Sequence, residues 1–180
     1  MTIEPTQIVL IDDNLESHDP LIIELQEIYG KQNVILRRRS SEGLNYIFEH
    51  LTSKMIVLLD LDLGAGEPHG AEVFDQIRSK TSLIYVIIIT AKLFEDIRRS
   101  DLIKFINNDA LAIVNNTDSI SDILRLVGKA AHELETRIDC VLEEWISKRT
   151  NDELKAPYVT SKSGKTYSLE ELIVEIRMET

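Results

Sequence analysis

Short apolar runs alternate with helix-length amphipathic segments along the first part of this 180-residue chain. The runs are rich in Val, Ile and Leu, and they occupy residues 7–11, 33–36, 55–59, 85–89 and 110–114. The segments between them carry apolar residues three and four apart, at 21–29, 42–51, 71–78 and 93–106. Strands that are apolar throughout are typical of a parallel sheet covered by helices on both faces. The pattern therefore predicts an α/β fold, a doubly wound five-stranded parallel sheet with strand order 2-1-3-4-5.

Composition and charge exclude several classes of protein. The 31 acidic and 20 basic side chains give a net charge of −11, which repels nucleic-acid phosphates, so direct DNA binding is not expected. The basic run at 37–39 is short, and we expect it to be solvated or paired with acids. The single Cys140 excludes a disulfide framework within one chain and a cysteine-based zinc site. Because no apolar run approaches ~20 residues and the first residues do not resemble a signal peptide, we expect a soluble, cytoplasmic protein with no membrane partner.

The apolar spacing changes after the fifth strand. Apolar residues then recur at intervals of four and three, as in a coiled-coil heptad, at Ile120, Leu124, Val127, Ala131, Leu134, Ile138, Val141 and Trp145. One helix of about 30 residues would be about 45 Å long and would extend beyond the sheet with this stripe uncovered. The pattern predicts a homodimer through the 120–145 helix. The alternative is a fifth helix followed by a separate one that folds back, and Gly128 is a point where a break can occur.

The remainder of the chain is polar and short. Residues 158–160 and 165–167 flank the sequence SKSG, which predicts a β-hairpin closed through Gly164. Ser168 and Glu171 form a capping-box pattern that opens a final helix. With six acidic and four basic residues and no helix-turn-helix pattern, this tail is expected to be a protein-interaction or oligomerisation appendage. The predicted division of the chain is a sheet domain, a coiled-coil-like helical extension and a small α+β tail, at 1–128, 129–150 and 151–180.

Acidic side chains follow two strands that are neighbours in the predicted sheet. Asp12 and Asp13 come directly after the first strand, Asp60 ends the third, and Thr90 ends the fourth. The carboxyl ends of these strands meet at one edge, so the carboxylates should converge. Carboxylates this close need neutralisation, and their oxygens suit a hard cation such as Mg2+. Asp62 is a rival for the role of Asp60, which we prefer because it ends the apolar run directly.

Four motifs at these strand ends resemble the receiver domains of two-component response regulators. They are the acidic pair in IVLIDDN, the third strand in VLLDLDLG, the glycine-led third helix in GAEVFDQIR and the switch threonine in VIIITA. The resemblance covers about residues 5–128. It implies that Asp60 accepts a phosphoryl group and that Asp12, Asp13 and Asp60 hold Mg2+ directly or through water. It also implies that Thr90 hydrogen-bonds a phosphoryl oxygen.

The sequence departs from the receiver pattern after the fifth strand. The family's lysine aligns with Asn116, which can hydrogen-bond a phosphoryl oxygen but supplies no positive charge. Ile113 occupies the aromatic switch position, and the loop after the third strand carries extra residues. Lys92 and Lys104 are candidates for supplying the charge instead.

The resemblance implies a signalling protein, phosphorylated by a sensor histidine kinase or a phosphotransfer protein, that acts through protein–protein contacts. It implies no enzyme activity beyond self-phosphorylation from a phosphodonor and slow autodephosphorylation. The alternative is a pseudo-receiver that is not phosphorylated and serves as an interaction or dimerisation scaffold. A flavodoxin-like enzyme is a weaker alternative, because no phosphate-cradling glycine loop follows the first strand.

Overall fold

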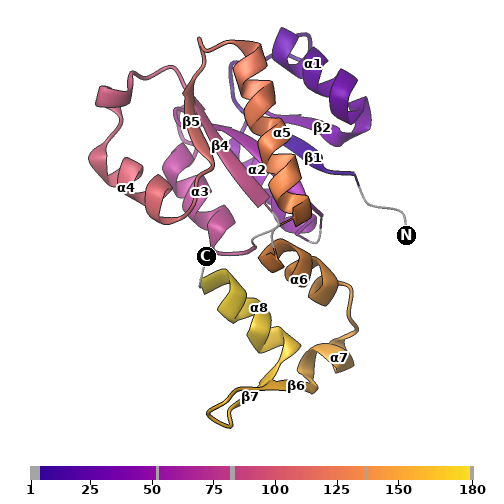
Figure 1. Cartoon of the computed structure of the whole chain (residues 1–180). Coiled ribbons are helices and arrows are strands. Elements are labelled where there is room, and N and C mark those ends of the chain that lie inside the picture. Colours follow the sequence, from indigo (N-terminus) through magenta and orange to yellow (C-terminus); the bar gives the residue numbers. More distant parts are fainter. Residues whose placement is uncertain (1–4, 52, 82–83, 137, 179–180) are drawn as a thin grey trace.

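A five-stranded parallel sheet forms the centre of the molecule (Figure 1). The computed structural model describes residues 5–51, 53–81, 84–136 and 138–178. The strand order is β2-β1-β3-β4-β5 with every pair parallel, so the predicted fold class and strand order are confirmed. The strands are β1 (Gln7–Ile11), β2 (Val34–Arg37), β3 (Met55–Asp60), β4 (Ile84–Thr90) and β5 (Ala112–Asn115).

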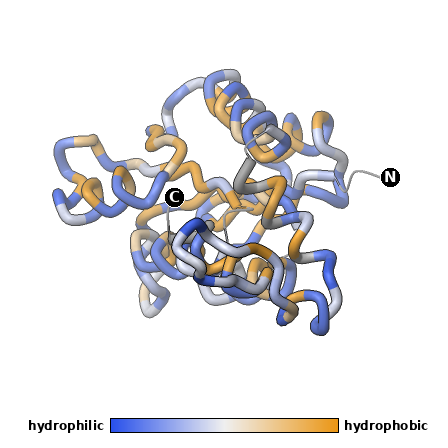
Figure 2. The backbone as a smooth tube through the Cα atoms, turned by 60° about the horizontal axis from the view of Figure 1, so that its bottom comes forward, coloured by the Kyte–Doolittle hydropathy of each residue, from blue (hydrophilic) through white to orange (hydrophobic). Residues whose placement is uncertain are grey.

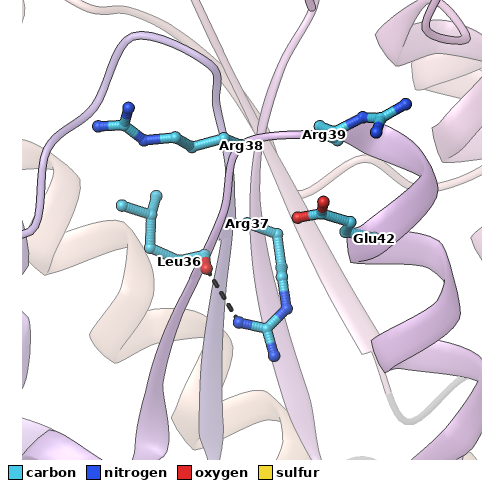
Figure 3. Close-up of a pocket in the computed structure, with 5 residues that line it drawn as sticks. All are labelled: Leu36, Arg37, Arg38, Arg39 and Glu42. Carbon is cyan, nitrogen blue, oxygen red and sulfur yellow. Dashed lines mark hydrogen bonds between the residues drawn. The ribbon is translucent and has the colours of Figure 1, made fainter.

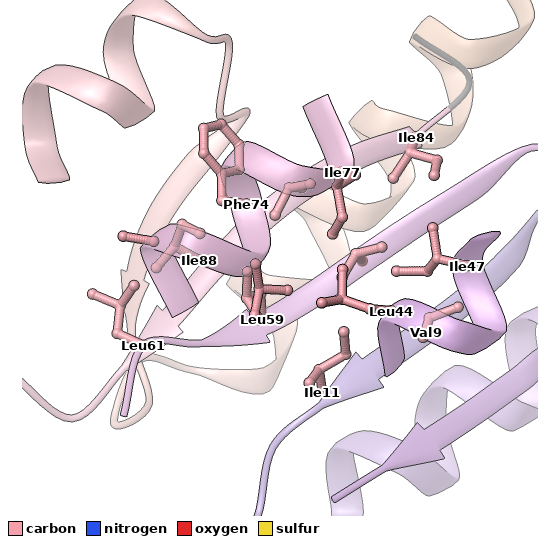
Figure 4. Packing of buried hydrophobic residues seen from close by; sticks show 14 of the residues in the cluster. Val9, Ile11, Leu44, Ile47, Leu59, Leu61, Phe74, Ile77, Ile84 and Ile88 are labelled. Carbon is pink, nitrogen blue, oxygen red and sulfur yellow. The ribbon is translucent and has the colours of Figure 1, made fainter. Parts of the chain in front are cut away.

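Helices cover both faces of the sheet, and each face has its own apolar core. One core joins the sheet to α1 (Pro20–Tyr29) and α5 (Ile120–Thr136). The other joins it to α2 (Ser40–Glu49), α3 (Gly70–Arg78) and α4 (Arg99–Asn107), and Figure 4 shows part of it. Figure 2 shows hydrophobic stretches running through the middle of the molecule, surrounded by helices in which hydrophobic and hydrophilic residues alternate.

Successive residues of β1 point to opposite cores, as a strand buried on both faces requires. Ile8 and Leu10 belong to the first core, and Val9 and Ile11 belong to the second. All four side chains are completely buried, and each contributes about 1.5–3 kcal/mol of burial free energy. This double burial explains the unbroken apolar run in the sequence.

The register of the sheet brings the carboxyl ends of three strands into line. Ile11 at the end of β1 lies opposite Leu59 of β3, so the residues after β1 begin beside the end of β3. Asp60 in turn lies opposite Ile89, one residue before Thr90. The acidic residues and the threonine are therefore gathered at one edge.

The region between β4 and β5 is less regular than predicted. The segment predicted as one helix over 93–106 consists of a 3-10 turn, η2 (Phe94–Asp96), and then α4. Ile97 separates them in an extended conformation with φ −73° and ψ 129°, and its side chain is buried in the second core. Burial of this side chain accounts for the interruption. A second 3-10 turn, η1 (Lys31–Asn33), precedes β2.

A small lobe follows the sheet domain (Figure 1). The predicted hairpin is confirmed, with Gly164 at φ 86° in its turn. The predicted capping box is confirmed too, because the Ser168 amide donates to Glu171 Oε2 at 2.9 Å and the Glu171 amide donates to Ser168 Oγ at 3.2 Å. The elements of the lobe are α6 (Ile138–Ser147), α7 (Asn151–Lys155), β6 (Pro157–Thr160), β7 (Thr166–Ser168) and α8 (Leu169–Met178).

The prediction of one continuous helix over 120–145 is wrong. α5 ends at Thr136 and α6 begins at Ile138, and Figure 1 shows α6 taking a different direction. Gly128 lies inside α5 and does not break it. Leu134, which was expected beyond the sheet, is completely buried in the first core. The predicted domain boundary at 128 therefore falls inside a helix that belongs to the sheet domain.

The lobe covers part of the predicted stripe within the same chain. α6 packs against α8, and Ile146 of α6 is 2% exposed. The rings of Trp145 and Tyr158 lie 5.6 Å apart, and Lys54 pairs with Glu144 at 2.8 Å across the boundary with the sheet domain. The folded-back alternative thus describes this part of the chain, although the side chain of Ile138 lies outside the described residues. Within the described ranges, no helix combines the length and apolar composition needed to cross a membrane.

Candidate functional site

Three carboxylates converge at the carboxyl edge of the sheet. Asp12 and Asp13 lie in the loop that leaves β1, and Asp60 is the last residue of β3. One oxygen of each carboxylate lies within 4.8 Å of the oxygens of the other two. The structure thus brings together the three residues that the sequence indicated for a metal site.

Hydrogen bonds from neighbouring residues orient the three carboxylates. Asp12 Oδ1 accepts hydrogen bonds from the amides of Asn14 at 2.8 Å and Leu15 at 3.0 Å. Asp13 Oδ1 accepts from Asn14 Nδ2 at 2.9 Å, and Asp60 Oδ1 accepts from the Asp62 amide at 3.2 Å. Each bond lies within three residues of its acceptor, so the turns after the strands hold the cluster in place.

The electrostatic state of the cluster fits a divalent cation. Burial raises the pKa of Asp60 to about 6, and the negative charges of Asp12 and Asp62 act in the same direction. A carboxylate that is costly to ionise beside other acids gains from a cation that neutralises it. The cluster also offers only oxygen ligands, which Mg2+ prefers. The residues present therefore fit a Mg2+ site.

Thr90 and Asn116 share a cleft with Asp12 and Asp60. The side chain of Thr90 is 2% exposed, and the Asn116 amide donates to the Thr90 carbonyl at 3.0 Å. Thr90 and Asn116 thus line the same cleft as two of the carboxylates. The structure places these two predicted site residues at the cleft, while their role remains a prediction.

The two lysines named as candidates lie in different places. Lys104 Nζ pairs with Asp75 Oδ2 at 2.5 Å, where α4 meets α3. Lys92 Nζ pairs with Asp62 Oδ1 at 2.7 Å, and Asp62 lines the cleft. Ile113 is part of β5 and packs against the second core.

Glu67, in the extended loop after β3, was not identified from the sequence. Its Oε2 accepts from Ser40 Oγ at 2.7 Å and from the Ser41 amide at 3.1 Å, and its Oε1 accepts from Arg39 Nε at 2.7 Å. These bonds lower the pKa of Glu67 to about 2. The carboxylate caps the N-terminus of α2, where the residue at the N-cap provides no side-chain bond of its own. This long-range cap holds the loop against α2.

Gly70 lets α3 begin directly beside the phosphoacceptor candidate. Its amide donates to the Leu61 carbonyl at 3.0 Å. A Cβ at this position would lie 2.4 Å from the Asp60 carbonyl oxygen and 2.7 Å from Leu61 Cα. Since both are backbone atoms, only glycine allows this approach.

The basic run at 37–39 lies at the end of β2, where Figure 3 shows its three side chains diverging. Arg38 pairs with Glu16, and Arg39 pairs with Glu67 at 2.7 Å. The Arg37 guanidinium donates to the carbonyl of the preceding residue at 3.0 Å. The expectation of ion pairs is confirmed for two of the three arginines.

Comparisons with known proteins show a structural likeness only. No protein-family model and no curated protein matches the sequence. A CheY-like receiver domain from Methanospirillum hungatei JF-1 matches with a TM-score of 0.59 and 20% identity, over 73% of this chain and 97% of that one. The NtrX receiver domain from Brucella abortus matches with a TM-score of 0.57 and 15% identity, over 70% and 98%. The signal receiver domain of a LuxO repressor protein from Vibrio parahaemolyticus matches with a TM-score of 0.56 and 17% identity, over 82% and 100%. Sheet topology and structural likeness together show that this chain has the fold of a response-regulator receiver domain.

Proposed function

We propose that this protein is a receiver that accepts a phosphoryl group on Asp60 with Mg2+ and signals through protein–protein contacts. The observation that carries the proposal is the convergence of Asp12, Asp13 and Asp60 within 4.8 Å at the carboxyl edge of a receiver-fold sheet. The phosphodonor is a sensor histidine kinase or a phosphotransfer protein. The proposed location is the cytoplasm, and the proposed chemistry is confined to self-phosphorylation and slow autodephosphorylation.

The chemistry requires a nucleophile and a way to screen its charge. A carboxylate oxygen of Asp60 attacks the phosphorus of a phosphohistidine, a new P–O bond forms, and the P–N bond breaks with its electron pair left on the imidazole nitrogen. When bound, Mg2+ would screen the repulsion between the carboxylates and the phosphoryl oxygens. The Thr90 hydroxyl and the Asn116 carboxamide then donate hydrogen bonds to phosphoryl oxygens in the cleft they share with Asp60.

A pseudo-receiver is the second candidate, and Asn116 is the observation that favours it. An amide in place of a lysine removes a charge-assisted bond, which stabilises a phosphoryl group about twice as strongly as a neutral bond. In this alternative the same fold binds its partner whether or not phosphate is present.

Acetyl phosphate distinguishes the two candidates. We expect Mg2+-dependent phosphoryl incorporation, measured by intact-protein mass spectrometry, to occur in wild type and to be absent in Asp60→Asn. Asp62→Asn is the matched control and should still be phosphorylated. Undiminished incorporation in Asp60→Asn would move the assignment to Asp62. If wild type neither incorporates a phosphoryl group from acetyl phosphate nor binds beryllofluoride, the pseudo-receiver is favoured.

The lobe formed by α6 to α8 is proposed as a protein-interaction or oligomerisation appendage. A homodimer through the 120–145 segment remains a prediction, but its surface is smaller than the sequence indicated, because Leu134 is buried. The apolar side chains left exposed on α6 are Val141 at 46%, Leu142 at 43% and Trp145 at 36%, among the described residues.

A further inference from the structure

A phosphoryl group on Asp60 would place a charge of about −1.5 to −2 in a cleft that is already acidic. Asp12, Asp13 and Asp62 lie beside Asp60, and Asn116 brings no charge. With Asp60 phosphorylated, the charges of Asp12 and Asp13 would balance the two positive charges of a bound Mg2+. The phosphoryl oxygens that face away from the ion therefore still need a positive partner. The following inference rests on the proposed function and identifies that partner.

Lys92 is linked to the cleft by its backbone and by its side chain. Its amide donates to Thr90 Oγ1 at 3.2 Å, and its carbonyl accepts from Asn115 Nδ2 at 3.2 Å. Its Nζ lies 2.7 Å from Asp62 Oδ1, and the Asp62 amide donates to Asp60 Oδ1 at 3.2 Å. Asp62 thus contacts both the Lys92 ammonium group and the carboxylate of the candidate phosphoacceptor. The backbone of Lys92 is held by hydrogen bonds to the last residues of β4 and β5.

The pairing of Lys92 with Asp62 is easily exchanged. The Lys92 side chain is 37% exposed and that of Asp62 is 49% exposed, and ion pairs this open to water contribute little stability. A phosphoryl dianion carries more charge than one carboxylate and offers three acceptor oxygens. Once Lys92 leaves, Asp62 keeps a neighbour in His69, whose Nε2 lies 3.8 Å from the same Oδ1.

The other basic side chains near the cleft have partners of their own among the described residues. His69 caps α3, since its Nδ1 accepts from the Ala71 amide at 3.2 Å. Arg98 Nε is bound to Asp101 Oδ2 at 2.8 Å. Lys104 is paired with Asp75, where α4 meets α3.

We propose that Lys92 supplies the positive charge for a phosphoryl group on Asp60, and that Asp62 holds Lys92 at the edge of the cleft until phosphoryl oxygens replace it. The charge then comes from the loop after β4, and Asn116 contributes only a hydrogen bond. Lys92 is in this sense a ligand of the phosphoryl group, and Asp62 is a positioning residue.

Beryllofluoride, which mimics the phosphoryl group without a covalent step, tests the proposal. We expect Lys92→Met to weaken Mg2+-dependent beryllofluoride binding, measured by 19F NMR titration, by about tenfold or more, the loss typical of one charge-assisted bond. Lys92→Arg should retain most of the affinity. Lys104→Met is the matched control and should bind as wild type. Affinity for Mg2+ alone should not fall in Lys92→Met, because removing a cation cannot weaken the attraction of a second cation to the acids.

A double-mutant cycle separates contact with the phosphoryl group from neutralisation of Asp62. Asp62→Asn alone should bind beryllofluoride more tightly, because the loss of a negative charge beside the phosphoryl site outweighs the loss of the contact that positions Lys92. Lys92→Met in that background should still lower the affinity, and Asn116→Lys added to Lys92→Met should restore it. If Lys92→Met has no effect in the Asp62→Asn background, Lys92 only neutralises Asp62 and the proposal is overturned. If wild type binds no beryllofluoride, the proposed function fails as well, whereas binding that is equal in wild type and Lys92→Met removes this inference alone.

Discussion

Replacing Asp60 by asparagine should stabilise the fold when Mg2+ is absent. Burial and neighbouring acids oppose ionisation of this carboxyl and raise its pKa from 3.8 to about 6. Asparagine keeps the shape and the acceptor for the Asp62 amide, but it carries no charge. We therefore expect Asp60→Asn to have the higher free energy of unfolding at neutral pH in EDTA.

The size and sign of this effect follow from the shift in pKa. A group whose pKa is raised on folding contributes stability that is complete below its unfolded value of 3.8 and is lost as pH rises through about 6. Two pKa units correspond to roughly 3 kcal/mol. Because the Asp60 carboxyl is partly open to solvent, screening reduces the expected gain to about 1–2 kcal/mol. The advantage of Asp60→Asn should grow from about pH 4 to about pH 6 and then level off.

Urea unfolding of both proteins at several pH values measures this gain. Asp96→Asn, at an exposed position outside the cluster, is the control and should change stability little. Adding Mg2+ should reverse the order, because a ligand at one hundred times its Kd stabilises wild type by about 2.7 kcal/mol and Asp60→Asn has lost one of the ligands. An Asp60→Asn variant no more stable than wild type in EDTA, or a gain independent of pH, would refute the reasoning.

Three further predictions concern the glycines, the loop cap and the oligomeric state. Gly70→Ala should lower the free energy of unfolding by more than about 2 kcal/mol, because its Cβ would lie 2.4 Å from the Asp60 carbonyl oxygen. Gly128→Ala, whose Cβ would have nothing within 4 Å, should instead raise it by about 0.5–1 kcal/mol. Thermal unfolding compares the two variants. Glu67→Gln should speed hydrogen exchange at the first amides of α2. Because the pKa of Glu67 is lowered to about 2, its contribution to stability is present above pH 4.5 and is lost as pH falls toward about 2. Unchanged exchange would argue against the cap. If the chain dimerises through α6, sedimentation equilibrium should show a dimer that Leu142→Glu dissociates, whereas a monomeric wild type would contradict the dimer.

The sheet and the acidic cluster could be predicted because both depend on patterns within single strands. A strand buried on both faces must be apolar throughout, as residues 8–11 are, and the residue that ends it must lie at the carboxyl edge. Asp12, Asp13 and Asp60 follow directly from that rule. The hairpin and the final helix were predictable for a similar reason, since their turn and cap residues act locally.

The end of α5 could not be predicted, because periodicity does not say what covers an apolar stripe. The heptad pattern continues past Thr136, but Leu134 is buried by its own domain and Ile146 by the lobe. The short helix α7 was missed although the sequence carries its signal, a capping box formed by Thr150 and Glu153.

The cap by Glu67 was unpredictable for a different reason, because its bonds to Ser40 and Arg39 span 27 and 28 residues. Such contacts depend on how two loops meet after folding. The same holds for Lys92 and Asp62, which are 30 residues apart. The sequence could name Lys92 as a candidate, but only the packing of the two loops could separate it from Lys104.

These long-range contacts give the departures from the receiver pattern a common physical basis. The extra residues after Asp60 form a loop that Glu67 attaches to α2 and that Gly70 returns to the strand end. Asp62 lies in this loop and holds Lys92 beside the cleft. If the proposed phosphorylation occurs, positive charge for the phosphoryl group has to come from an element other than the turn after β5, and a fixed acidic loop can hold it beside the cleft. If Lys92 takes this role, loosening the loop with Glu67→Gln should weaken beryllofluoride binding without altering the cluster itself. Unchanged binding in that variant would show that the position of Lys92 does not depend on the loop cap.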